Sequence, residues 1–151
     1  MKIGDKATDF TLQNTEGKEV RLSSITSEGS VVLLFFPLAF SSVCTNEMCT
    51  VRDNFKMFKS LNAIVIGISV DSFFTLKAFK QMNNIPFPLL SDFNKIVSKE
   101  YGILNNDFYG MVGVAKRSAF VIDQDMKIIH REVMDDAGNM PDFKAIHDAL
   151  G

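Results

Sequence analysis

The stretch VVLLFFPLAFSSVCTNEMC, residues 31–49, joins a buried strand to a helix and contains both cysteines of the chain. Its opening apolar run, VVLLFF, is typical of a strand covered on both faces. Pro37 ends this strand because proline cannot donate a hydrogen bond to a sheet. Ser41 and Ser42 can each cap a helix, so we expect Cys44 to lie in the first turn of the helix that follows.

The start of a helix is a favourable place for a reactive thiol. Free backbone N–H groups and the positive end of the helix dipole stabilise a thiolate relative to a thiol. Open α/β sheets also tend to place their functional sites where a strand ends and a helix begins. Cys44 is therefore a candidate nucleophile, although a free cysteine can equally be a small residue packed in a core.

Cys49 stands five residues after Cys44. In a regular helix that spacing puts the two Cα atoms about 8 to 9 Å apart, on different faces. A disulfide forms without backbone movement only when the Cα atoms are within about 7 Å. The two cysteines can therefore bond only if the helix unwinds, which suits a transient catalytic disulfide. The alternative is that Cys49 only packs in a helix interface.

Around this stretch, buried strands alternate with helices, and a hairpin and a helix end the chain. The expected strands are two within residues 8–25 around a turn at 14–17, then 31–36, 63–70 and 87–92, and a hairpin over 118–133 with its turn at 123–126. Four helices are expected: one over residues 48–61, one that begins after a cap at Asp71 or Ser72, one over 94–101, and a last one with Pro141 in its first turn. Residues 103–116 are interpreted as a loop. This order predicts an α/β fold with a mixed central sheet flanked by helices and an N-terminal β-hairpin. It is compatible with a thioredoxin-like fold, and the pattern alone also allows a flavodoxin-like sheet.

The composition indicates one domain over residues 1–151 with a sizeable apolar core. A net charge of −2 without a long basic run gives no reason to expect nucleic acid or a membrane as a partner. The N-terminus lacks the apolar core of a secretory signal, and no apolar run approaches the about 20 residues that span a bilayer. We therefore expect a cytoplasmic protein in a reducing compartment, where stabilising disulfides are rare.

The histidines do not suggest a metal site. Zinc sites usually combine four ligands at close spacings. His130 and His147 lie far from both cysteines and from each other in the sequence. We therefore expect no metal and assign neither histidine a role.

The residues around Cys44 resemble the active-site signature of the peroxiredoxins, P-x-x-x-[T/S]-x-x-C. Pro37, Ser41 and Cys44 match it, and Glu47 matches the carboxylate or amide usual three positions after the cysteine. The segment KRSAFVID resembles the one that supplies the family's active-site arginine, which would be Arg117. Without the resemblance, Arg117 would be interpreted as a solvated basic residue. The resemblance spans nearly the whole chain and implies a thioredoxin-like fold.

Two branches of the family compete. The letters CTNEMC followed by RDN resemble the bacterioferritin comigratory protein (peroxiredoxin Q) branch, whose resolving cysteine lies five residues after the peroxidatic one. The letters FFPLAFSSVC resemble the one-cysteine alkyl hydroperoxide reductase E branch. The Pro-Gly pair that commonly precedes the reactive cysteine in the first branch is missing here. Cys49 favours the branch with a resolving cysteine.

The resemblance implies a thiol peroxidase that needs no bound cofactor. The implied roles are Cys44 as peroxidatic nucleophile, Cys49 as resolving cysteine, Arg117 as the cation that holds thiolate and peroxide, Ser41 as a hydrogen-bond donor to them, Glu47 as the group that orients the arginine, and Pro37 as a shield against water. Substrates would be hydrogen peroxide or organic hydroperoxides, and thioredoxin or a glutaredoxin-like protein would reduce the disulfide of a monomer or homodimer. Phe40, Phe108 and Tyr109 are candidates for an apolar pocket or a dimer face, or simply for the core.

Two other functions stay open at this point. An oxidised Cys44 could signal to a partner, as in a redox sensor of thioredoxin fold. A thiol–disulfide oxidoreductase is disfavoured, because the chain has no C-x-x-C pair.

Overall fold

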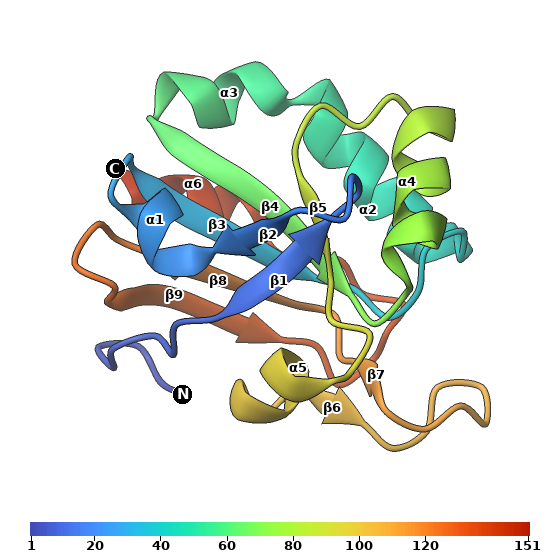
Figure 1. Cartoon of the computed structure of the whole chain (residues 1–151). Helices are drawn as coiled ribbons and strands as arrows, with labels where there is room; N and C mark the ends of the chain where they lie inside the picture. The colour runs from blue at the N-terminus through green and yellow to red at the C-terminus, as the bar shows by residue number, and fades with distance from the viewer.

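A mixed β-sheet with helices on both faces forms the fold in the computed structural model, which describes residues 1–151 (Figure 1). The elements are β1 (Thr11–Asn14), β2 (Glu19–Arg21), α1 (Leu22–Thr26), β3 (Ser30–Phe35), α2 (Ser42–Asp53), α3 (Phe55–Ser60), β4 (Ala63–Ser69), α4 (Phe73–Met82), β5 (Leu89–Ser91), α5 (Ile96–Glu100), β6 (Leu104–Asn105), β7 (Val114–Ala115), β8 (Ser118–Ile122), β9 (Ile128–Val133) and α6 (Phe143–Leu150). The large sheet has the strand order β2-β1-β5-β4-β3-β8-β9, and β6 and β7 form a separate two-stranded sheet.

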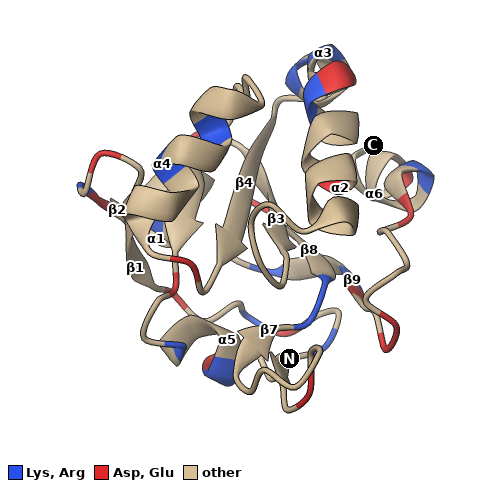
Figure 2. Ribbon diagram, turned by 90° about the vertical axis from the view of Figure 1, so that its right-hand side faces the viewer, with Lys and Arg blue, Asp and Glu red and all other residues tan.

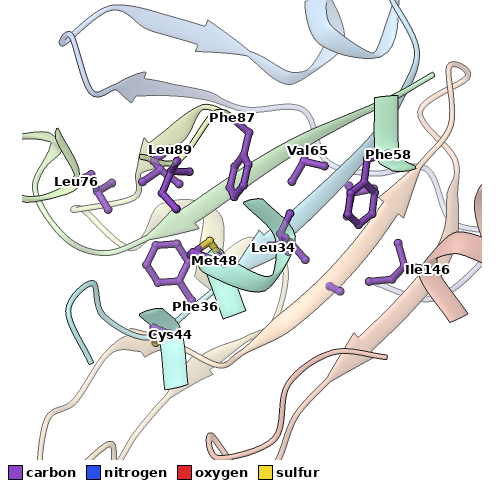
Figure 3. Close-up of a cluster of buried hydrophobic side chains, with 14 of the residues drawn as sticks. Leu34, Phe36, Cys44, Met48, Phe58, Val65, Leu76, Phe87, Leu89 and Ile146 are labelled. Carbon is purple, nitrogen blue, oxygen red and sulfur yellow. The ribbon is translucent and has the colours of Figure 1, made fainter. Parts of the chain in front are cut away.

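The predicted apolar strand is the centre of the sheet. In β3, the side chains of Val32 and Leu34 join a buried cluster with residues of α2, α3, α4 and α6 (Figure 3). Val31, Leu33 and Phe35 point to the opposite face, where α1 and α5 contribute to a second buried cluster. The prediction of a strand covered on both faces is therefore confirmed.

The pairing of β3 brings three chain segments together at one edge of the sheet. β3 runs parallel to β4, with Phe35 opposite Ile68, and antiparallel to β8, with Phe35 opposite Ser118. The loop after β3, the residues after β4 and the residues before β8 therefore lie side by side. Parallel strands place their carboxyl ends together in this way, which is where α/β proteins build their sites.

Several predicted elements are confirmed. The N-terminal hairpin forms as β1 and β2, and the C-terminal hairpin forms as β8 and β9. The expected helix after the second buried strand is α4, and Gly102 follows α5 in the left-handed region with φ of 71°. Glycine favours this conformation at a helix end because it has no Cβ.

Other predictions about elements were wrong. The single helix expected over residues 48–61 is two helices, because the backbone at Asn54 leaves the helical region with φ of −112° and ψ of 18°. Pro141 precedes the last helix instead of standing in its first turn, and Asp142 is the residue that caps it. The short helix α1 and the small sheet of β6 and β7 were not predicted.

Charged residues lie mostly on the helices and loops, and the central strands β3 and β4 contain none (Figure 2). None of the helices combines the length and the apolar character that a membrane span requires.

Candidate active site

Cys44 lies in the first turn of α2, as predicted, and its side chain is fully buried. Together with Met48 it points from the helix into the cluster that also contains Phe36 (Figure 3). The apolar surroundings alone would make it an inert thiol. Its only polar partner is Arg117, whose Nη2 donates to the Sγ at 3.0 Å. A cation at this distance stabilises negative charge on the sulfur.

Arg117 is the residue just before β8, and its side chain extends from there to the Cys44 sulfur. Only 1% of Arg117 is exposed. Each nitrogen of its guanidinium has one partner: Nη2 the Cys44 sulfur, Nη1 the Glu47 Oε1 at 2.6 Å, and Nε the carbonyl of Ala137 at 3.1 Å. Burial lowers the pKa of Arg117, but the charges of Glu47 and Cys44 and the hydrogen bonds to them outweigh burial and raise it above its ordinary value. The guanidinium is therefore a fixed, permanently charged group.

Glu47 completes the row of buried polar groups. It follows Cys44 by three residues, so the helix places both side chains on one face. The side chain is fully buried, and its Oε2 has no hydrogen-bond partner. Burial raises the pKa of Glu47 to about 7, although the charge and the hydrogen bond of Arg117 lower it. Glu47 is therefore the member of the ion pair that titrates near neutrality.

This shift predicts how stability depends on pH. The folded protein binds the Glu47 proton more tightly than the unfolded chain, whose carboxyl has a pKa of 4.5. The contribution of this proton to the free energy of unfolding is fully present below pH 4.5 and is lost as the pH rises to about 7. Across that window, we expect wild type to lose about 1 to 3 kcal/mol more unfolding free energy than Glu47→Gln. Urea denaturation at a series of pH values measures this, and parallel curves for the two proteins would contradict it.

Pro37 and Ser41 lie in the loop between β3 and α2. Pro37 is buried. Ser41 is the N-cap residue of α2 but makes no side-chain cap bond, because its Oγ donates to the carbonyl of Leu38 at 2.7 Å. Ser41 therefore stands at the cap position expected from the sequence, but its side chain does not cap the helix. In this structure the hydroxyl makes no hydrogen bond to the Cys44 sulfur.

A small cavity of about 50 Å³ leads to Arg117. It is lined by Ser41, Ser42, Val43, Phe108, Tyr109, Arg117, Ala137 and Gly138. This space can hold a few water-sized groups. Of the aromatics considered from the sequence, Phe108 is mostly buried, whereas Tyr109 is 90% exposed and Phe40 49% exposed. The part that residues 137–138 take in the site was not predicted. A backbone carbonyl that accepts a hydrogen bond from an arginine leaves no signal in the sequence.

Cys49 occupies a different side of α2. It is half-buried, and its thiol donates to Oδ1 of Asn83, at the end of α4, at 3.8 Å. Arg52 donates to the carbonyl of the same Asn83 at 2.6 Å. Both cysteines are free thiols, one directed to β8 and the other to α4. A disulfide between them therefore requires α2 to unwind.

The histidines lie away from this site. His130, on β9, pairs with Glu132 at 2.8 Å, and His147, on α6, lies 3.6 Å from Asp148. No group of three or more His, Cys, Asp or Glu side chains is arranged to hold a metal ion.

Comparison with known proteins gives a consistent result. Residues 3–131 match the AhpC/TSA family. The chain is 38% identical over 143 residues to a chloroplastic 2-cysteine peroxiredoxin of Chattonella marina var. antiqua, covering 88% of this chain and 71% of the relative. It is 34% identical over 152 residues to alkyl hydroperoxide reductase E of Mycobacterium bovis, covering 99% and 96%.

A solved structure extends the likeness to three dimensions. The crystal structure of peroxidoxin BcpB from Mycobacterium tuberculosis superimposes with a TM-score of 0.89 at 33% identity, covering 99% of this chain and 96% of that one. The thioredoxin-like fold expected from the sequence is thereby confirmed over the flavodoxin-like alternative. The family match and the relatives support a peroxide substrate and a thiol reductant. By its sequence and its fold, this chain belongs to the AhpC/TSA family and is a peroxiredoxin, a thiol-dependent peroxidase.

Proposed function

We propose that Cys44 is the peroxidatic residue, which reduces hydrogen peroxide and organic hydroperoxides, and that Cys49 resolves it. The observation that carries this proposal is the buried Arg117 guanidinium, which bridges the Cys44 sulfur at 3.0 Å and Glu47 at 2.6 Å beside a small cavity. A thiolate nucleophile and a fixed donor for developing charge are what peroxide cleavage requires.

In the first step, the Cys44 thiolate attacks the terminal oxygen of the peroxide. The S–O bond forms as the O–O bond breaks, and the leaving hydroxide or alkoxide takes up a proton as water or alcohol. Cys44 is oxidised to a sulfenic acid. Arg117 Nη2 donates to the sulfur before the attack and to the leaving oxygen as the O–O bond breaks, so the negative charge is stabilised throughout.

The neighbouring residues prepare this step. Glu47 holds one edge of the Arg117 guanidinium and so directs the other edge at the sulfur. Ser41 lines the cavity, and its hydroxyl can rotate from the Leu38 carbonyl to the peroxide oxygen. Pro37 is buried within the loop between β3 and α2, where it keeps water from the thiolate.

In the second step, the Cys49 thiol condenses with the sulfenic acid. The S–S bond forms, and the sulfenic oxygen leaves as water. The start of α2 is suited to unwinding, because it has neither a side-chain cap bond nor an acidic residue in its first turn. Capping residues commonly stabilise a helix by about 1 kcal/mol, and α2 lacks this contribution.

A dithiol protein closes the cycle by thiol–disulfide exchange. We assign this role to thioredoxin or a glutaredoxin-like donor in the cytoplasm, where reduced dithiols are available. The working form is a monomer or a homodimer.

Turnover assays with two reductants test this proposal. With thioredoxin and its reductase, wild type should sustain peroxide consumption, and Cys49→Ser should lose it by at least about tenfold, because no disulfide forms for the donor to attack. With a small dithiol, Cys49→Ser should retain turnover. Equal turnover of both proteins with thioredoxin would support a one-cysteine mechanism. Oxidation without turnover under any reductant would support a redox sensor.

A further inference from the structure

The carboxylate of Asp71 is directed at the loop that leads into α2. Asp71 follows β4, and its Oδ2 accepts hydrogen bonds from the backbone N–H of Ala39 at 2.8 Å and from the hydroxyl of Ser69 at 2.6 Å. Its own carbonyl accepts from Ser91 Oγ at 2.6 Å. One residue therefore ties the loop between β3 and α2 to the ends of β4 and β5.

This carboxylate does not cap the helix that follows it. The sequence left open whether Asp71 or Ser72 caps α4, and Ser72 is the cap, because its Oγ accepts from the N–H of Thr75 at 3.2 Å. Asp71 is thus free to serve the loop. The N–H of Ala39 has no backbone acceptor, and Ala39 is only 9% exposed. Without Asp71 this N–H would lie nearly buried and unpaired, which is unfavourable.

The residue after Ala39 has an unusual backbone conformation. Phe40 has a φ of 70°, in the left-handed region that bulky residues rarely adopt. Such conformations persist only where the surroundings hold them, and they are common at functional sites. The ring of Phe40 packs edge-to-face on Phe79 at 5.3 Å, and the Asp71 bond fixes the peptide between Leu38 and Ala39, one residue earlier. Phe40 directly precedes Ser41, the N-cap residue of α2, so this turn sets the direction in which α2 leaves the sheet.

We propose that Asp71 is a positioning residue for peroxide reduction. By accepting a hydrogen bond from the Ala39 N–H, Asp71 holds the left-handed turn at Phe40. This turn places Cys44 against Arg117. The proposal rests on the proposed function of Cys44. Displacing reacting groups by about 1 Å can lower a rate by about 10²-fold, so loss of this hydrogen bond is expected to affect catalysis and not only stability.

Single-turnover kinetics of Cys44 oxidation by hydrogen peroxide test the proposal, with reduced protein and with the folded fraction checked by circular dichroism. We expect Asp71→Ala to be about 10- to 100-fold slower than wild type. Asp71→Asn, whose amide oxygen can still accept the Ala39 N–H, should recover most of that loss. If Asp71→Ala does not fold, Asp71→Ser takes its place. The serine hydroxyl lies one bond closer to the backbone than the aspartate carboxylate oxygens.

Asp92 provides the matched control. This carboxylate is 1% exposed and accepts from the backbone N–H groups of Val97 and Ser98 at the start of α5, on the other face of the sheet. Asp92→Ala should lower stability but leave the rate of the folded protein unchanged. Equal rates for Asp71→Ala and Asp92→Ala would overturn the role of Asp71. If Cys44 of wild type is not oxidised at all, the proposed function itself fails.

Discussion

Replacing Cys44 by serine lowers the rate of peroxide reduction by at least about 10³-fold, which is the largest effect that we expect from any single substitution. A serine hydroxyl beside Arg117 is a far weaker nucleophile than a thiolate, and it has no sulfenic acid chemistry. The side chain is fully buried and loses little volume, so the variant should fold. Stopped-flow measurement of peroxide consumption with a small dithiol as reductant gives the rate.

Cys49→Ser is the matched control, because it makes the same chemical change on another side of α2. It should keep a fast first oxidation, so only Cys44→Ser loses the reaction with peroxide. Comparable loss in both variants would mean that the two thiols act as one site. Full activity of Cys44→Ser would exclude Cys44 as the nucleophile.

Replacing Arg117 by methionine should slow the oxidation of Cys44 by about 10² to 10³-fold, as for loss of an oxyanion-hole donor. The change removes the donor to the sulfur and leaves Glu47 buried without its partner. Because burial already raises the pKa of Glu47 to about 7, that carboxyl can be protonated at mildly acidic pH, and the variant should remain folded there.

Arg117→Lys separates charge from geometry. A lysine ammonium keeps the positive charge but cannot bond the Cys44 sulfur and Glu47 with the planar fork of a guanidinium. We expect an intermediate rate, slower than wild type by about tenfold. Single-turnover stopped-flow kinetics at pH about 6 compare the three proteins. A wild-type rate in Arg117→Met would contradict the role of the guanidinium.

The stretch from β3 to Cys44 could be predicted because its signals are local. An uninterrupted apolar run, a proline and two serines define a strand end and a helix start within a few residues. Weak or short signals failed elsewhere: α1 has only five residues, and β6 and β7 have two each. The break at Asn54 interrupts a helical periodicity that is itself continuous, so periodicity alone could not reveal it.

Which residues form the site depends on contacts between segments that lie far apart in the sequence. Arg117 on its own would be interpreted as a solvated residue, and only the resemblance to peroxiredoxins indicated its role; in the structure it is 1% exposed. Asp71 and Ser72 are equally good caps by sequence, and only the pairing of β3 with β4 shows why Asp71 turns to the loop. Local pattern determines where a helix begins, but tertiary contacts determine what each polar group bonds.

Peptide mass spectrometry after one equivalent of hydrogen peroxide is added to reduced protein decides whether Cys44 reacts and Cys49 resolves it. We expect a rapid loss of two hydrogens and a linked peptide that joins Cys44 to Cys49, since condensation of the sulfenic acid with a thiol releases water. That product would also show that α2 unwinds during the cycle. A sulfenic or sulfinic acid on Cys44 with Cys49 still free would contradict resolution by Cys49. Absence of rapid modification at either thiol would contradict the peroxidatic role of Cys44 itself.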